Sequence, residues 1–177
     1  MGFGCSAKSA TSLGFLKSAR HRALRQFLDA IRSELSGDVL GPMCSMTEDT
    51  DTAALSIQQL SEPIEFEIEP DGRLFVSASC SSLGPGYLAW AVELLRRAAT
   101  VARIELVWLE DDTEYSRDGD FKNLQRQAAS WLSVVGKEVL KLSTEAGAAL
   151  SISLRADLVR PVTSDVLTPL GPRPREW

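Results

Sequence analysis

The sequence of 177 residues has one histidine, His21, and three cysteines, Cys5, Cys44 and Cys80. A serine or cysteine nucleophile paired with histidine would have to use His21, which stands among bases on a predicted helix. Three cysteines without a Cys-x-x-Cys pair indicate neither a disulfide framework nor a zinc site. We therefore expect no catalytic residue, metal ligand or cofactor, and we favour a non-enzymatic protein of a reducing compartment, the cytoplasm.

The sequence also lacks a long apolar run and an excess of basic charge. No run approaches the about 20 apolar residues of a transmembrane helix, and no segment near the N-terminus has the hydrophobic length of a signal peptide. Nineteen Lys and Arg residues against 24 Asp and Glu residues give a net charge of −5. This sign disfavours general binding to nucleic acid.

Charge is distributed unevenly along the chain. Residues 38–71 contain nine acids and no base, whereas residues 1–37 carry six bases and two acids. Such an asymmetry is typical of ion pairing within the chain or of recognition of a protein partner.

Apolar periodicity predicts an α+β fold, organised as an α/β-like two-layer sandwich with helices mainly on one face. The expected order is α-β-β-α-β-α-β, at residues 17–35, 64–69, 73–80, 87–101, 104–109, 121–142 and 148–154. Pro70-Asp71-Gly72 predicts a β-hairpin turn. Two β-α-β crossovers then predict parallel neighbours in a mixed sheet of four or five strands, with the continuously apolar strand 104–109 at its centre.

Composition divides the chain into three parts. We expect a flexible leader at residues 1–15, where small and polar residues predominate. A single globular domain should follow at residues 16–160, with a mobile acidic loop at 38–62. The four prolines from Pro161 onward predict an extended tail at residues 161–177.

The acidic loop at residues 110–120 is the main candidate for binding a partner. Acidic surfaces steer basic partners to a protein, and an aromatic residue such as Tyr115 is a typical interface anchor. We assign partner binding to Glu110, Asp111, Asp112, Glu114, Tyr115 and Asp118. Two alternatives remain open for this loop: some acids cap the following helix, or several of them bind a cation.

The turn Gly84-Pro85-Gly86 is the main candidate for binding a small ligand. A Gly-rich turn between a strand and a helix can bind phosphate through converging backbone N–H groups. Here Walker-A spacing is absent, no lysine is nearby, and Pro85 removes one donor, so a structural helix start is favoured. A ligand at this turn would contact Gly84, Gly86, Tyr87 and Trp90.

These observations favour a non-enzymatic protein-binding module, such as an inhibitor or immunity-type protein, an adaptor or a chaperone-like partner, that recognises a basic protein surface through acidic loops. The alternative is a small-ligand or phosphate-binding sensor or enzyme that uses Gly84-Pro85-Gly86 and residues 110–120. A further alternative is a peripheral membrane protein with a lipid on Gly2 or Cys5, since the first six residues match an acylation pattern. Homodimerisation stays open.

Overall fold

The computed structural model describes residues 4–38, 40–57, 63–79, 84–146, 158–159, 165–168 and 171–174. Its first elements are β1 (Gly4–Ser9), α1 (Lys17–Ser36), the 3-10 turn η1 (Gly41–Met43), β2 (Cys44–Glu48), β3 (Thr52–Ile57), β4 (Ile64–Ile68) and β5 (Leu74–Ser79). The later elements are α2 (Pro85–Ala102), β6 (Leu106–Asp111), α3 (Tyr115–Asp118), α4 (Phe121–Ala146), β7 (Leu158–Val159), β8 (Asp165–Thr168) and β9 (Gly171–Pro174).

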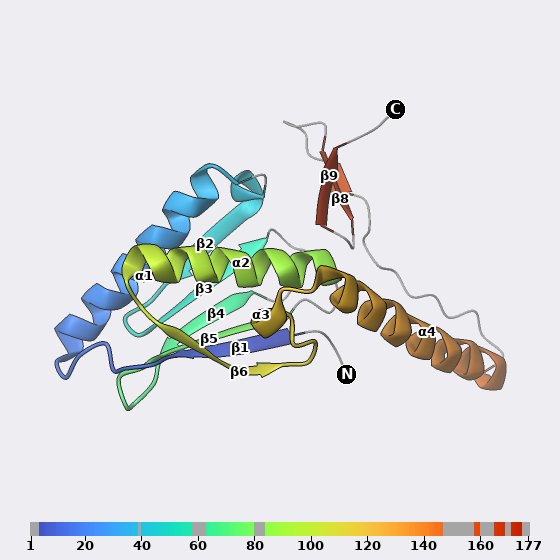
Figure 1. The fold of residues 1–177 in the computed structure, drawn as a ribbon, viewed down its shortest axis with the longest axis horizontal. Helices are drawn as coiled ribbons and strands as arrows, with labels where there is room; N and C mark the ends of the chain where they lie inside the picture. The colour runs from blue at the N-terminus through green and yellow to red at the C-terminus, as the bar shows by residue number, and fades with distance from the viewer. Residues whose placement is uncertain are drawn as a thin grey trace.

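The main body is a six-stranded sheet, in the order β2-β3-β4-β5-β1-β6, on which α1 and α2 pack (Figure 1). Every pairing in this sheet is antiparallel. A separate three-stranded antiparallel sheet contains β7, β8 and β9. The predicted α+β class is therefore confirmed, with six strands in the main sheet rather than four or five.

The core lies between the two helices and one face of the main sheet. On β4, Ile64, Phe66 and Ile68 are buried and the intervening glutamates are exposed, because successive side chains of a strand point to opposite faces. The rings of Phe27 on α1 and Phe66 pack edge to face with centroids 6.0 Å apart. The predicted apolar stripe of the first helix is buried as expected: Leu24, Phe27, Leu28, Ile31 and Leu35.

The predicted hairpin is present between β4 and β5. Gly72 adopts a positive φ of 80°, and its N–H donates to the Glu69 carbonyl at 2.8 Å. The Glu69 N–H donates to the carbonyl of Arg73 at 2.9 Å, which closes the turn. Gly is required here because side chains disfavour this φ, and a Cβ on Gly72 would also lie 2.5 Å from the Ser12 hydroxyl.

The predicted flexible leader is wrong for residues 4–9. They form β1, which lies between β5 and β6 and pairs with both. Ala7 has no exposed surface and Cys5 is 6% exposed, so one side of this strand belongs to the interior. Small residues suit the core side of β1 because α2 packs close to this strand. The opposite side of β1 carries no core residue, so large apolar side chains are not needed there.

The predicted mobile loop at 38–62 is also wrong where the structure describes it. It contains η1, β2 and β3, and β2 and β3 form an antiparallel hairpin. In β3, Ala53, Leu55 and Ile57 are buried on the helix side. The acids that suggested a loop are concentrated at the turn of this hairpin, at Glu48, Asp49 and Asp51.

The predicted central strand is an edge strand. β6 pairs with β1 alone among the strands of the described chain. β5 and β6 run in the same direction, as a β-α-β crossover requires, but β1 is inserted between them and removes the expected parallel pairing. The apolar run of β6 reflects partly exposed residues, since Val107 is 46% exposed and Leu109 is 51% exposed.

The C-terminal part of the chain contains the long helix α4, which extends beyond the sheet (Figure 1). Leu124 and Ala128 are buried near its start, whereas Val134 is 58% exposed farther along. The predicted strand 148–154 lies outside the described residues. Strands β8 and β9 fall within the predicted extended tail. Among the described helices, none has the length and apolar character to cross a membrane.

Candidate functional site on the open face of the sheet

The face of the main sheet opposite α1 and α2 is acidic. The six strands contain one base, Lys8, and five acids. Two of these acids do not belong to this face: Glu48 pairs with Arg32 of α1, and Asp111 bonds Thr113 and Ser116. Glu65, Glu67 and Glu110 are exposed. We call the face that bears Ser6, Glu65, Ser77 and Glu110 the open face.

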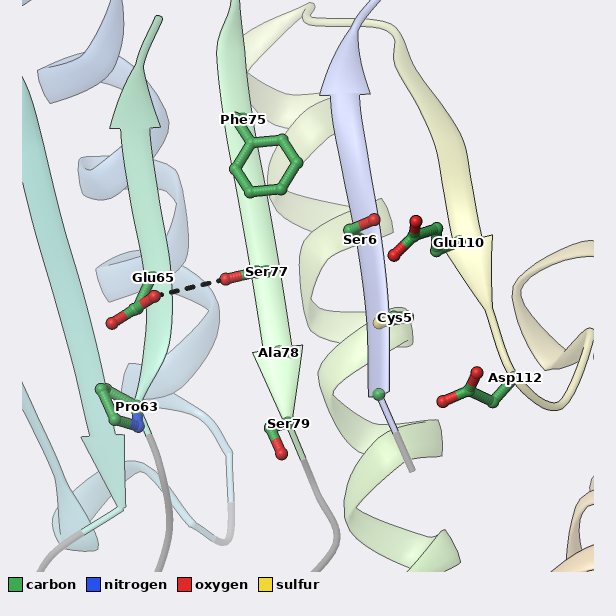
Figure 2. Close-up of a pocket in the computed structure, with 11 residues that line it drawn as sticks. Cys5, Ser6, Pro63, Glu65, Phe75, Ser77, Ala78, Ser79, Glu110 and Asp112 are labelled. Carbon is green, nitrogen blue, oxygen red and sulfur yellow. Dashed lines mark hydrogen bonds between the residues drawn. The ribbon is translucent and has the colours of Figure 1, made fainter. Parts of the chain in front are cut away.

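A hollow of about 400 Å³ lies on the open face where β4, β5, β1 and β6 meet. Figure 2 shows Glu65 and Ser77 on one side of it and Glu110 and Asp112 on the other, with the helices behind the strands. The Ser77 hydroxyl lies 3.5 Å from a Glu65 oxygen. The residues that line the hollow include three carboxylates and no lysine or arginine. It therefore suits a cationic group.

The one base of the strands is engaged outside this hollow. Lys8 forms ion pairs with Glu69 and with Asp71, the latter at 3.0 Å. Hydrogen bonds to Glu69 and then to Asp71 raise the pKa of Lys8. Lys8 does not line the hollow, so the charges of Glu65, Glu110 and Asp112 are available to a partner.

Two of the six predicted partner-binding residues, Glu110 and Asp112, line this hollow. Both are exposed. Glu110 stands directly opposite Ser6 in the β1–β6 ladder, and Asp112 follows the end of β6. Glu114 and Asp118 are also exposed but do not line the hollow.

Asp111 points away from the hollow and organises the turn after β6. Its carboxylate accepts hydrogen bonds from the Thr113 N–H at 2.9 Å, the Thr113 hydroxyl at 2.7 Å and the Ser116 N–H. Burial raises the pKa of Asp111, but the hydrogen bonds from Ser116 and Thr113 outweigh it and hold that pKa below its usual value. This side chain therefore stabilises the loop. The alternative that an acid caps the long helix is met by Asp120, which accepts a hydrogen bond from the Asn123 N–H in the first turn of α4 at 3.0 Å.

Tyr115 is not the exposed anchor that the sequence predicted. It is 8% exposed, and its ring packs edge to face on Phe121 with centroids 6.4 Å apart. Burial is the largest cause of the raised pKa of its hydroxyl. The prediction that this aromatic residue is an interface anchor is wrong, because its ring joins the loop to α4.

Glu65 was not assigned a binding role from the sequence. The sequence does indicate that Glu65 is exposed, because the strict alternation of residues 64–69 places every glutamate on the face away from the core. What the sequence did not show is that β1 and β6 bring Glu110 and Asp112 to the same face.

The Gly84-Pro85-Gly86 turn begins α2 and belongs to the interior. Pro85, Gly86 and Tyr87 are buried. Trp90 is half-buried, and its Nε1 donates to an Asp38 carboxylate oxygen at 3.1 Å. Residues of this chain therefore cover Tyr87 fully and Trp90 in part, and these are the side chains predicted at a ligand site.

The remaining candidates have structural positions. His21 lies on α1, with its Nδ1 2.8 Å from the Thr50 carbonyl oxygen, and thus joins α1 to the β2–β3 turn. The Cys5 side chain is buried, so a lipid on it would require β1 to open; Gly2 lies outside the described residues. Within those residues, no group of three or more His, Cys, Asp or Glu side chains could hold a metal ion.

Compared with protein-family models, curated proteins and solved structures, the chain shows no significant match to any of them. The fold places the chain in the α+β class, with two helices on one face of an antiparallel sheet. Its function has to be argued from the open face itself.

Proposed function

We propose that this chain is a non-enzymatic protein-binding module that recognises a basic protein surface through the open face of its sheet. The observation that carries this proposal is the hollow lined by Glu65, Glu110 and Asp112 without a base. Cationic side chains of a partner would neutralise these three charges.

The electrostatics of the open face favour a basic partner. Two unit charges about 4 Å apart attract by about 4 kcal/mol near a protein surface, before the cost of desolvation. Several acids on one face also accelerate association with a cationic partner, and salt weakens this effect. Phe75, half-buried in the same hollow, adds a ring on which an arginine or lysine can stack.

The hollow is built mainly on strands, which limits the cost of binding. Glu65 and Ser77 stand on β4 and β5, and Ser6 and Glu110 on β1 and β6. Groups held by a paired sheet lose less conformational freedom on binding than groups on a free loop. Small residues such as Ser6 and Ser77 also allow a partner to approach the sheet closely.

A charge-reversal experiment tests the proposed function. Proteins bound by the chain in extracts of its source would be cross-linked, identified by mass spectrometry, and then purified for titration against variants. We expect the variant Glu110→Lys with Asp112→Lys to bind the identified basic protein at least about 100-fold more weakly, since each reversal turns an attraction into a repulsion.

The matched control is Glu138→Lys with Glu145→Lys, which changes the net charge equally at two exposed acids of α4. It should keep the affinity of the unmodified chain, and both variants should keep its unfolding midpoint. Equal loss of binding in both variants would show that only net charge matters and would overturn the role given to the open face.

A further inference from the structure

The edge strand β6 presents backbone groups to which another strand can bond. The Ala10 N–H donates to the Glu105 carbonyl at 2.8 Å, just before β6 begins. Because bonded and non-bonded residue pairs alternate in an antiparallel ladder, Leu106 and Trp108 point their N–H and C=O groups away from β1. These groups lie at the free edge of the sheet.

β6 lacks two of the features that usually protect an edge strand, although a bulge and the acids Glu110 and Asp111 lie near its end. It contains no lysine and no proline, and Val107 and Leu109 are about half exposed. The register shifts between Ser6 and Ala7, which leaves Leu109 without a partner in the ladder. This bulge lies beyond Leu106 and Trp108 and leaves the first half of the edge regular.

A second hollow, of about 580 Å³, lies on the helix side of this edge, between α2 and β6. Ala99, Ile104, Leu106 and Trp108 give it an apolar lining, and Arg96 and Arg103 also line it. Leu106 and Trp108 pack against the core from this side. Apolar side chains of a strand added beside β6 would fill this hollow.

The opposite side of the same edge carries the exposed Val107, opposite Lys8, and becomes acidic beyond the bulge. Glu110 on β6 and Asp112 just after it line the hollow of the open face. Since successive side chains of a strand point to opposite faces, an added strand presents alternate residues to the acids and to the α2–β6 hollow. The complementary sequence therefore alternates basic and apolar residues.

We infer that the free edge of β6 binds an extended segment of the partner protein as an additional strand, with basic side chains on the open face and apolar side chains in the α2–β6 hollow. This inference rests on the proposed function and names the segment that is recognised. A second copy of β6 is a poor occupant, because Leu106–Asp111 contributes two acids and no base.

Three synthetic peptides of about seven residues, a typical strand length, test this inference. One alternates lysine and valine, one has the same composition in two blocks, and one alternates glutamate and valine. NMR titration gives the affinity of each, and amide exchange reports protection of Leu106 and Trp108. We expect the alternating lysine–valine peptide to bind about tenfold more tightly than the block peptide and to protect both amides.

The outcomes separate the inference from the proposed function. Equal affinity for the two lysine peptides, without protection of Leu106 and Trp108, would overturn the edge site and leave the acidic face as the binding surface. Equal affinity for the lysine and glutamate peptides, or no binding of any peptide at millimolar concentration, would reject both. Self-association through β6, seen as dimers in sedimentation, would assign the edge to a second copy and also overturn the inference.

A pair of variants tests the backbone contact directly. Leu106→Pro removes an N–H that points outward, at the first residue of a strand, where proline is tolerated. Leu106→Ala is the matched control, since it shortens the same side chain but keeps the N–H. We expect Leu106→Pro to bind the alternating peptide about tenfold more weakly than Leu106→Ala. Equal affinities of the two variants would contradict strand addition. If Leu106→Pro does not fold, protection of the Leu106 and Trp108 amides in the unmodified chain remains as an independent test.

Discussion

At the scale of single residues, the direction of each side chain separates the residues proposed to bind a partner from those that stabilise the acidic segment. Glu110 and Asp112 reach the hollow of the open face, whereas Asp111, between them, turns back to bond the chain at Thr113 and Ser116. Adjacent acids in the sequence thus face different environments. Burial of Tyr115 against Phe121 fixes the same turn from its other side.

The substitution Asp111→Asn tests the structural role. We expect it to lower the free energy of unfolding by about 1–2 kcal/mol at neutral pH, because one acceptor oxygen and the charge are lost from a partly exposed site. The pKa of Asp111 is lowered in the folded state, so the carboxylate stabilises the fold above its ordinary pKa of 3.8. That contribution is lost as the pH falls through the lower folded value.

Denaturant titrations between neutral pH and pH 2 provide the measurement. The difference between the unmodified chain and Asp111→Asn should shrink below about pH 3.8. Asp112→Asn, at the exposed neighbouring acid, is the control and should unfold like the unmodified chain at every pH. A difference for Asp111→Asn that stays constant with pH would refute the contribution of its charge.

At the scale of elements, hydrophobic periodicity predicted α1, α2, α4 and the β4–β5 hairpin because each buries one regular face. β1 was not predicted because Gly-Cys-Ser-Ala-Lys-Ser has only two apolar side chains, the small Cys5 and Ala7, which are too few to indicate a strand. β2 and β3 were not predicted because the acids of the turn between them indicated a loop. The same reasoning predicted strand 104–109 but not its place, because apolar character alone cannot distinguish a central strand from an edge strand with exposed Val107 and Leu109.

Two glycine substitutions test the role of the hairpin turn. We expect Gly72→Ala to lower the free energy of unfolding by at least about 1–2 kcal/mol, because alanine disfavours a φ of 80° and its Cβ would contact Ser12 and Arg20. Gly136→Ala in α4 is the counterpart, since nothing beyond the neighbouring backbone of its own helix lies within 4 Å of its added Cβ.

Gly136→Ala should instead stabilise its helix by about 1 kcal/mol. Thermal unfolding gives the effect of Gly72→Ala, and amide exchange along α4 gives the local effect of Gly136→Ala. If Gly72→Ala left the free energy of unfolding unchanged, the turn would have to adopt another conformation of equal stability, which would contradict the prediction.

At the scale of the whole molecule, part of the unevenly distributed charge forms ion pairs within the chain. Arg32 on α1 pairs with Glu48 of β2, Lys17 lies 3.6 Å from Asp51, and Arg97 of α2 lies 2.8 Å from Glu34. These pairs join the helices to one another and to the β2–β3 hairpin. Surface ion pairs of this kind contribute about 0–1 kcal/mol each to stability.

Removal of residues 1–10 tests the position of β1 in the sheet. β1 supplies the only strand partner of β6 within the described chain, and Ala7 and Cys5 are part of the buried interior. We expect the shortened chain to lose cooperative thermal unfolding, whereas a flexible leader could be removed without effect. An unchanged calorimetric transition would contradict the contribution of β1 to the fold.

The sequence by itself determined the α+β class, the principal helices, the β4–β5 hairpin and the acidity of the segments that reach the open face, because these depend on local periodicity, turn chemistry and charge. Only the tertiary structure decided that β1 separates β5 from β6, that β6 is an edge, and that Glu65 joins Glu110 and Asp112 around one hollow. These depend on which distant strands pair, and pairing is set by the packing of the whole sheet against α1 and α2. No local pattern of residues specifies it.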